Sequence, residues 1–137
     1  ASRICHAHGR RSMKLVYALA FLAGPMAAQD VPSGQQVLLH EVLVDPQETV
    51  TWLRFRYLAP QIAAGDAQIT FDTAGEDMLH LCQTFAVAYM AEHALSADKI
   101  EISFMDRITE FGQPDPEAIQ YFESFREEDG VCIWDDY

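Results

Sequence analysis

VLLHEVLVDPQETVTWLRFRYL, residues 37–58, is the stretch of sequence that decides the fold. Two runs rich in β-branched and aromatic residues, 37–44 and 50–58, flank a polar segment that contains Asp45 and Pro46. Such runs favour strands, and Asp and Pro favour turns, so the stretch predicts a β-hairpin. We expect Asp45 to face Val50, which places Glu41 directly opposite Arg54.

This register divides the hairpin into two faces, because side chains alternate along a strand. Neither face is wholly polar. One face collects Leu38, His40, Val42, Leu53, Phe55 and Tyr57, and the other collects Leu39, Glu41, Leu43, Trp52, Arg54 and Arg56.

The middle of the chain predicts a helix between two strands. A short strand is predicted at 68–71, and Thr73 and Glu76 fit a capping box for a helix that runs to about Ala94. Alternation predicts a half-buried strand at 99–105. The helix carries apolar residues at spacings of three and four, which is typical of packing on a core: Met78, Leu81, Cys82, Phe85, Ala88 and Tyr89.

The last third predicts a second helix and a final strand. Asp115 followed by Pro116 is typical of a helix N-terminus, and an apolar stripe follows it before Gly130. Residues 131–134 read as a strand. The order β-β-(β)-α-β-α-β predicts one small α+β domain, with an antiparallel-type sheet and two helices packed on it. The stripe consists of Ala118, Ile119, Phe122 and Phe125.

Residues 13–28 have the features of a secretory signal peptide. Lys14 provides a basic flank, a run of ten apolar residues follows, and Ala28 is a small residue suited to cleavage. The run is shorter than the roughly 20 apolar residues that span a membrane. We therefore predict a periplasmic or secreted protein with an upstream leader at 1–12, a signal peptide at 13–28 and a single domain at 29–137. Arg10 and Arg11 leave twin-arginine export open as the alternative route.

Charge restricts the partners of the predicted mature chain. Residues 29–137 carry five Lys and Arg against 21 Asp and Glu, a net charge of −16. Such a surface repels phosphate backbones and anionic lipid, which excludes nucleic acid and membrane surfaces as partners. Basic proteins and cationic ligands fit it, although excess carboxylates also serve solubility alone.

Two cysteines follow the predicted leader, Cys82 and Cys132. An exported chain meets an oxidising environment, so we predict a disulfide between them. Cys82 lies in the middle of the predicted helix and no Cys-x-x-Cys motif accompanies it, which argues against a reactive thiol.

The histidines form no recognised metal or catalytic motif. No His-Glu-x-x-His or paired-cysteine spacing is present, so we predict neither a metal site nor a cofactor. His40 points toward the apolar side of the hairpin, where a hydrogen-bonded core histidine and a catalytic base both fit.

Trp52, Arg54 and Arg56 indicate a possible contact surface. The two arginines are among only five basic residues after the leader, and aromatic residues with arginine are typical of interaction hot spots. We predict that they form a partner-binding face with Leu39 and Leu43. In the alternative, a helix or the chain ends cover this face.

Three blocks are distinctive in combination: WLRFRYLAP at 52–60, ISFMDR at 102–107, and EFGxxDPEA with FExFRxxDGxCIW between 110 and 134. They resemble a family of short exported bacterial proteins of unknown function over essentially the whole mature chain. The resemblance implies no activity, because none is established for the family. Some members carry an acetolactate synthase label, which we reject here because this chain lacks the length and the Gly-Asp-Gly motif of those enzymes.

Two functions follow from these observations. The leading hypothesis is a non-enzymatic binding or accessory domain with a protein partner in the cell envelope. The alternative is a small envelope hydrolase built on Asp, Glu and His40, which a pocket joining His40 or Arg107 to a carboxylate would favour.

Overall fold

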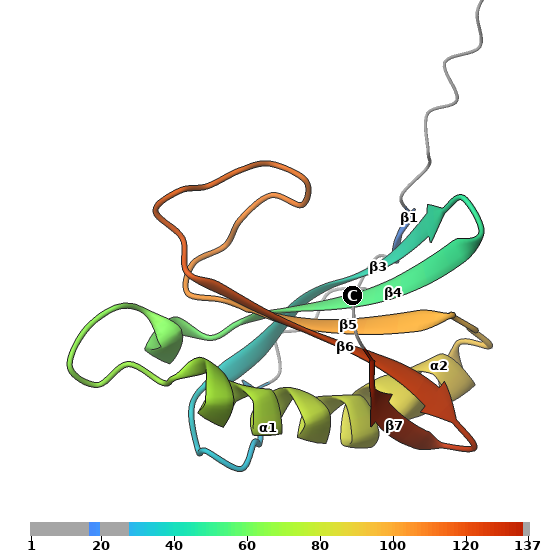
Figure 1. The fold of residues 1–137 in the computed structure, drawn as a ribbon, viewed down its shortest axis with the longest axis horizontal. Helices are drawn as coiled ribbons and strands as arrows, with labels where there is room; N and C mark the ends of the chain where they lie inside the picture. The colour runs from blue at the N-terminus through green and yellow to red at the C-terminus, as the bar shows by residue number, and fades with distance from the viewer. Residues whose placement is uncertain (1–16, 20–27, 136–137) are drawn as a thin grey trace, which may run out of the picture.

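The computed structural model describes residues 17–19 and 28–135 of the chain. They form one small α+β domain, as predicted, in which a mixed sheet packs against a long helix (Figure 1). The strands run in the order β1-β3-β4-β5-β6-β7, and β2 also pairs with β3. Their bounds are Tyr17–Leu19 (β1), Ala28–Gln29 (β2), Val37–Gln47 (β3), Val50–Leu58 (β4), Lys99–Met105 (β5), Gln120–Glu128 (β6) and Val131–Trp134 (β7).

The predicted hairpin is β3 and β4, but its register differs from the expected one. Gln47, and not Asp45, faces Val50, so the turn contains only Glu48 and Thr49. The positive φ of 43° at Glu48 suits such a tight hairpin turn. As a result Glu41 faces Arg56, and the predicted opposition of Glu41 and Arg54 is wrong.

A bulge in β3 changes which residues face the helix. The pairing with β4 shifts between Leu39 and Glu41, which leaves His40 as the extra residue. Leu39 and Val42 therefore both lie in the core, although they were predicted on opposite faces. His40 was predicted on the apolar side, and instead it lines a pocket with Glu41 and Leu43.

The helix begins earlier than its capping box predicts. Thr70 is the N-cap, and its hydroxyl accepts a hydrogen bond from the N–H of Thr73. The strand predicted at 68–71 is therefore absent, because Thr70 ends a loop and Phe71 opens the helix. The helix comprises α1 (Phe71–Leu81), a π-helical segment η2 (Cys82–Ala86) and α2 (Val87–Glu92). Ala88, predicted in the apolar stripe, is exposed. A short 3₁₀ helix, η1 (Pro60–Ile62), precedes the long helix in the chain.

The helix crosses from β4 to β5, which lie side by side and parallel. This pair departs from the antiparallel sheet predicted, because a connection that contains a helix returns the chain in the same direction. The other strand pairs are antiparallel. Among the described residues, no helix is long and apolar enough to cross a membrane.

The second predicted helix does not form. Residues 106–119 are a loop, and the stripe residues Phe122 and Phe125 belong to β6. Asp115 does make a turn, since its side chain accepts from the N–H of Glu117, but the turn is not continued. Pairing with β5 on one side and β7 on the other stabilises the strand instead.

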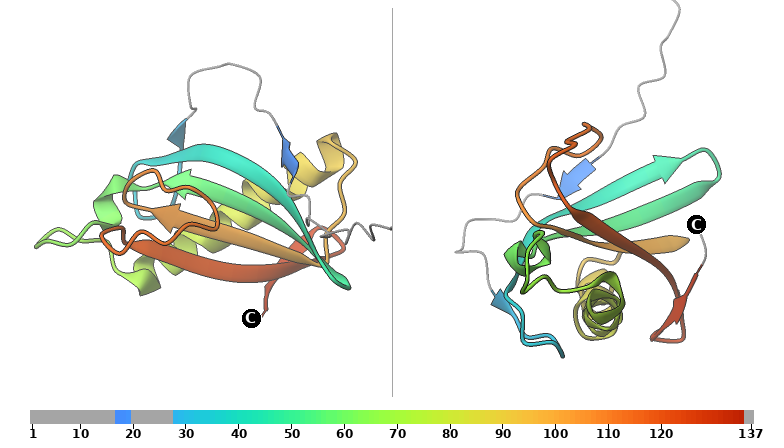
Figure 2. Two further views of the ribbon diagram at one scale, coloured as in Figure 1. Left: turned by 90° about the horizontal axis from the view of Figure 1, so that it is seen from above. Right: turned by 60° about the vertical axis from the view of Figure 1, so that its left-hand side comes forward.

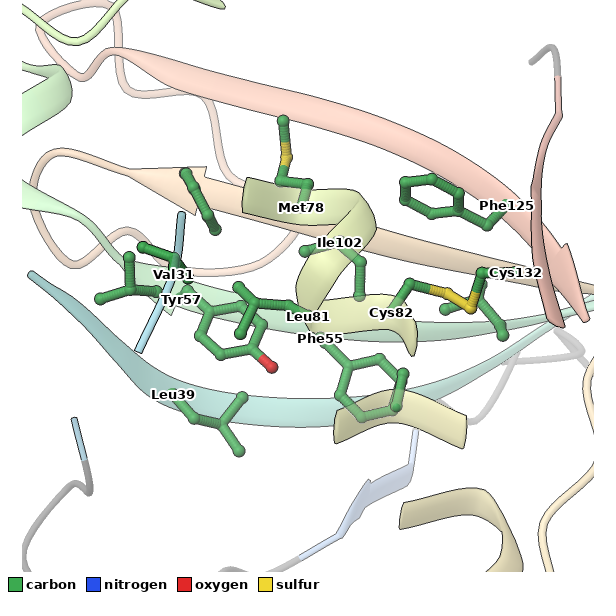
Figure 3. Close-up of a cluster of buried hydrophobic side chains, with 14 of the residues drawn as sticks. Val31, Leu39, Phe55, Tyr57, Met78, Leu81, Cys82, Ile102, Phe125 and Cys132 are labelled. Carbon is green, nitrogen blue, oxygen red and sulfur yellow. A yellow bond between two sulfur atoms is a disulfide. The ribbon is translucent and has the colours of Figure 1, made fainter. Parts of the chain in front are cut away.

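The core lies between the helix and one face of the sheet (Figure 3). Phe55 and Tyr57 of β4 and Ile102 of β5 meet Met78 and Leu81 of α1 there, all fully buried. The predicted disulfide is confirmed: Cys82 joins Cys132 and ties the helix to β7. Figure 2 shows the helix on one side of the sheet and the loop 106–119 on the other.

Candidate binding site on the open face of the sheet

The face of the sheet opposite the helix carries the two arginines of β4. Leu53, Phe55 and Tyr57 of this strand point to the core, so the alternating residues Arg54 and Arg56 point the other way. We call this side the open face. Its neighbouring strands place acidic side chains beside the arginines, namely Glu41 and Asp45 from β3 and Glu101 from β5.

Arg54 links two strands and two aromatic rings. Its Nε lies 2.9 Å from Oδ2 of Asp45, and its Nη1 lies 2.8 Å from Oε2 of Glu101. The guanidinium also lies 4.7 Å from the ring centroid of Trp52 and 5.5 Å from that of Phe111. These cation–π contacts and charged hydrogen bonds hold the side chain in one position.

Arg56 is buried, with 5% of its surface exposed. Its Nη1 donates to Glu41, and its Nη2 donates to both the carbonyl oxygen and the hydroxyl of Thr109, at 2.9 and 2.8 Å. Arg56 therefore ties β4 both to β3 and to the loop above it.

The loop at 106–119, which we call the covering loop, closes at its base. The N–H of Asp106 donates to the carbonyl of Ile119 at 3.0 Å, and the N–H of Ile119 donates back to Oδ1 of Asp106 at 2.9 Å. Arg107 follows, and its hydrogen bond to Asp106 raises the pKa of the guanidinium further. Compact loops with joined ends often carry function.

A pocket of about 260 Å³ lies between the covering loop and strands β4 to β6. Arg54, Arg56 and Glu101 line it together with Phe111 and Phe122, and we call these two exposed aromatic side chains its rim. Phe122 of β6 is 43% exposed, and Ile108 of the covering loop is 49% exposed. Exposed apolar side chains grouped beside polar ones are typical of contact sites for other molecules.

A second pocket, of about 440 Å³, adjoins the outer strand β3. His40, Glu41 and Leu43 line it from the strand, and residues 108–111 line it from the covering loop. Within the part of the chain that the structure describes, no hydrogen bond or ion pair joins His40 to a carboxylate. Glu41 is engaged by Arg56.

The open face brings together most of the residues predicted for partner binding. Trp52, Arg54, Arg56 and Leu43 lie on it, whereas Leu39 lies in the core. The expected alternative was a helix or the chain ends as the cover of this face; among the described residues it is the covering loop that contacts Arg56, through Thr109.

Three residues of the site were missed from the sequence: Thr109, Phe111 and Phe122. The first two lie in a loop with no periodic pattern, and Phe122 was assigned to a helix. No alternation marked Phe122, because residues 121–125 read apolar, apolar, polar, polar, apolar, a spacing that also fits a helix.

The basic side chains of residues 28–135 are all engaged in ion pairs within the described structure. Lys99 lies 3.5 Å from Asp135, and Arg126 lies 2.9 Å from Glu128, while the other three cations pair on or beside the open face. The excess charge at the surface is therefore carboxylate. Among these residues, no group of three or more His, Cys, Asp and Glu is placed to hold a metal.

Comparison with known proteins places these features in a family. A family of unknown function, DUF6497, matches residues 16–137. The chain belongs to this family. No curated protein and no solved structure matches it.

Membership in DUF6497 confirms the predicted resemblance to a family without an established activity, and it gives no support to an acetolactate synthase label. The match begins at residue 16, so the part shared within DUF6497 includes β1 as well as the open face.

Proposed function

We propose that this chain is an exported, non-enzymatic binding domain of the cell envelope, and that it holds a basic protein partner on the open face. The observation that carries the proposal is a set of three exposed apolar side chains: Phe111 and Phe122 line the arginine-lined pocket, and Ile108 lines the second pocket together with Phe111. Apolar anchors of this kind supply much of the affinity of protein interfaces.

The charge of the domain supports a basic partner. The cations of residues 28–135 are engaged by acids of the same chain, whereas Glu110 of the covering loop is exposed. A carboxylate-rich surface attracts lysine and arginine side chains and speeds their approach.

The arginines act in this proposal by positioning the covering loop, and the partner contacts the rim. Arg56 is too deeply buried to meet another protein, and removal of one member of a buried ion pair costs about 3–5 kcal/mol of stability. Arg56→Ala would therefore report on folding and not on binding. Phe122 is the better probe, because its side chain is exposed and makes no ion pair or hydrogen bond.

A photo-reactive phenylalanine analogue at position 122 tests the surface in the host cell. We expect it to cross-link to a protein with a basic surface, and we expect the same analogue at Val131 to give no such product. Val131 is the matched control because it is 53% exposed on β7.

Recovery of the partner from envelope extract provides the second measurement. Phe111→Ser with Phe122→Ser should abolish recovery, Val131→Ser should not, and recovery by the wild type should fall as salt screens the charges. Equal recovery by all three proteins would exclude the proposed surface.

Export is supported by the signal-like segment 13–28 and by a disulfide compatible with an oxidising compartment. The intact mass of the protein from a periplasmic or culture fraction tests it. We expect a chain that begins at Gln29 and has both thiols oxidised, and a protein found only in the cytoplasm with its leader intact would contradict export.

The second pocket supports an alternative, a small hydrolase of envelope components. His40 and Glu110 both line it, and a histidine beside carboxylates is suited to general base catalysis. The engagement of Glu41 by Arg56 weakens this reading, because that carboxylate is not free to orient the histidine. The alternative predicts hydrolysis of ester or peptidoglycan substrates that His40→Gln abolishes, and equal rates for both proteins would exclude it.

A further inference from the structure

The outer edge of β3 is covered by a segment that belongs to the predicted signal peptide. Strand β1 pairs antiparallel with β3, with Tyr17 opposite Val44 and Leu19 opposite Val42. Cleavage after Ala28 would remove β1 from the domain. Residues 42–44 of β3 would then lack a neighbouring strand on that side.

The turn of the hairpin determines which backbone groups this edge presents. A two-residue turn makes Gln47 and Val50 a hydrogen-bonded pair, and such pairs alternate along an antiparallel ladder. Val42 and Val44 therefore direct their N–H and C=O groups away from β4, toward β1. Pro46 takes the next outward position, where proline costs no sheet hydrogen bond.

The edge adjoins the second pocket. Leu43 lines that pocket, so a residue placed opposite Leu43 by an added strand would lie on the same side of the sheet as the pocket. Residues opposite Val42 and Val44 would lie on the core side, beside two apolar side chains. An added strand would thus be suited to apolar residues at three successive positions.

At the other edge of the sheet, formed by β7, the side chain of Gln83 already binds backbone groups. Gln83 accepts a hydrogen bond from the N–H of Cys132 at 3.0 Å and donates to the carbonyl of Gly130 at 2.7 Å. An unsatisfied strand edge invites pairing with another chain, and Gln83 blocks that pairing at β7. Among the described strands, β3 is therefore the one that leader removal would leave open.

We infer that the mature domain binds an extended segment of its protein partner as an additional antiparallel strand on residues 42–44, in the place that β1 occupies. This inference rests on the proposed function, in particular on export and cleavage of the leader. The segment has three successive apolar residues and flanking lysine or arginine, because the exposed Glu110 lines the pocket beside the edge.

A second copy of the chain is a poor occupant of this edge. Two copies of β3 that use both edge amides would pair Leu43 with Leu43 in antiparallel register, which places Glu41 opposite Asp45. Like charges directly opposite each other destabilise a strand pair. A basic segment avoids this repulsion.

A peptide from the predicted leader serves as the probe for this binding. Mature protein, residues 29–137 with the disulfide intact, is titrated with a peptide of residues 14–22 that carries two added C-terminal lysines for solubility. We expect binding, together with slower hydrogen exchange of the Val42 and Val44 amides.

Backbone methylation of the peptide separates strand addition from nonspecific apolar adhesion. In the register of β1, the N–H of Leu19 faces β3 and that of Ala18 faces away. N-methylation at Leu19 should weaken binding tenfold or more, whereas N-methylation at Ala18 should leave it nearly unchanged. Val44→Pro should weaken binding similarly, and the methylated peptides preserve the test if that variant fails to fold.

Several results would overturn the inference. Equal affinity of the two methylated peptides, protection of amides elsewhere in the protein, or a self-associated dimer that protects Val42 and Val44 would each do so. Failure of the proposed function has separate readouts. An uncleaved leader in the exported protein refutes the processing step, and loss of the cross-link at Phe122 refutes the partner surface.

Discussion

Arg56 of the central strand β4 donates two hydrogen bonds from one nitrogen to Thr109, one to its carbonyl oxygen and one to its hydroxyl. The covering loop is therefore held by a buried charge in the sheet, and the pocket beneath it depends on that contact. The aromatic rim contributes as well, since Phe111 lies 5.7 Å from the guanidinium of Arg56.

Thr109→Val should loosen the covering loop without a change in side-chain shape. The variant keeps the carbonyl contact but loses the hydroxyl acceptor, and a hydrogen bond to a charged group contributes about 1.5–3 kcal/mol. We expect the free energy of unfolding in urea to fall by about 1.5 kcal/mol and the amides of the loop to exchange faster. Thr49→Val, in the exposed hairpin turn, is the control and should change neither quantity.

Asp77→Ala should detach the segment before β3 from the helix. Asp77 is fully buried and accepts hydrogen bonds from the N–H and hydroxyl of Ser33 and from the side chain of Gln35. Removal of the carboxylate leaves these donors without their acceptor, at a cost of about 3 kcal/mol. Urea denaturation measures the loss, and the exposed Asp66→Ala should be neutral. Equal stability of the two variants would contradict this role for Asp77.

Tyr57→Phe and Tyr121→Phe should have opposite effects on stability. The Tyr57 hydroxyl is buried without a hydrogen-bond partner among the described residues, and burial raises the pKa of this phenol. Its removal should increase the free energy of unfolding by about 1 kcal/mol. The Tyr121 hydroxyl donates to the carbonyl of Ile69 at 2.9 Å, so its removal should decrease that energy by about 1 kcal/mol. Thermal denaturation of the two variants side by side gives the comparison, and destabilisation by both would show that Tyr57 has a partner.

Glu123→Gln should change how stability depends on pH. Burial raises the pKa of Glu123 above its ordinary value of 4.5, so the folded protein favours the protonated carboxyl group. Between 4.5 and the higher folded pKa the native state binds more protons than the unfolded state, and stability falls as pH rises.

The Glu123→Gln variant does not lose stability in this way as the pH rises. Its stability should match the wild type below the unfolded pKa, exceed it increasingly as pH rises through the folded pKa, and keep a constant advantage above that. Urea unfolding at a series of pH values measures the difference, with the exposed Glu92→Gln as the control. A difference that does not vary with pH would contradict the assignment.

Cys82→Ala with Cys132→Ala should destabilise the domain strongly. The disulfide spans 50 residues, for which the chain-entropy relation gives about 4 kcal/mol. We expect the variant and the reduced wild type to unfold at similar, much lower urea concentrations. A variant as stable as the oxidised wild type would show that packing around the helix and β7 suffices.

Local patterns were sufficient for much of the fold. The alternation of Ile100, Ile102 and Phe104 predicted β5 correctly, and the cysteine count with the inferred compartment predicted the disulfide. These features depend on residues close in sequence, or on a pair without competitors. The register of β3 and β4 was missed, because a turn of two residues and a bulge at His40 both fit the same apolar runs.

Prediction of the candidate site on the open face from sequence was limited in the same way. The sequence indicated that Trp52, Arg54 and Arg56 share one side of a strand, which follows from alternation alone. It did not indicate that Arg56 would be buried beneath residues more than fifty positions away, because that contact depends on where the covering loop returns.

The sequence by itself determined the fold class, the first helix, most strands, the disulfide and the acidic charge, since each follows from composition or short-range periodicity. Only the tertiary structure decided that residues 120–128 form a strand and that a loop covers the arginines. Apolar residues four positions apart lie on one face of a helix and also on one face of a strand, so their spacing does not distinguish the two structures. The backbone groups of β5 selected the strand, because a central strand needs a hydrogen-bonded neighbour on both sides.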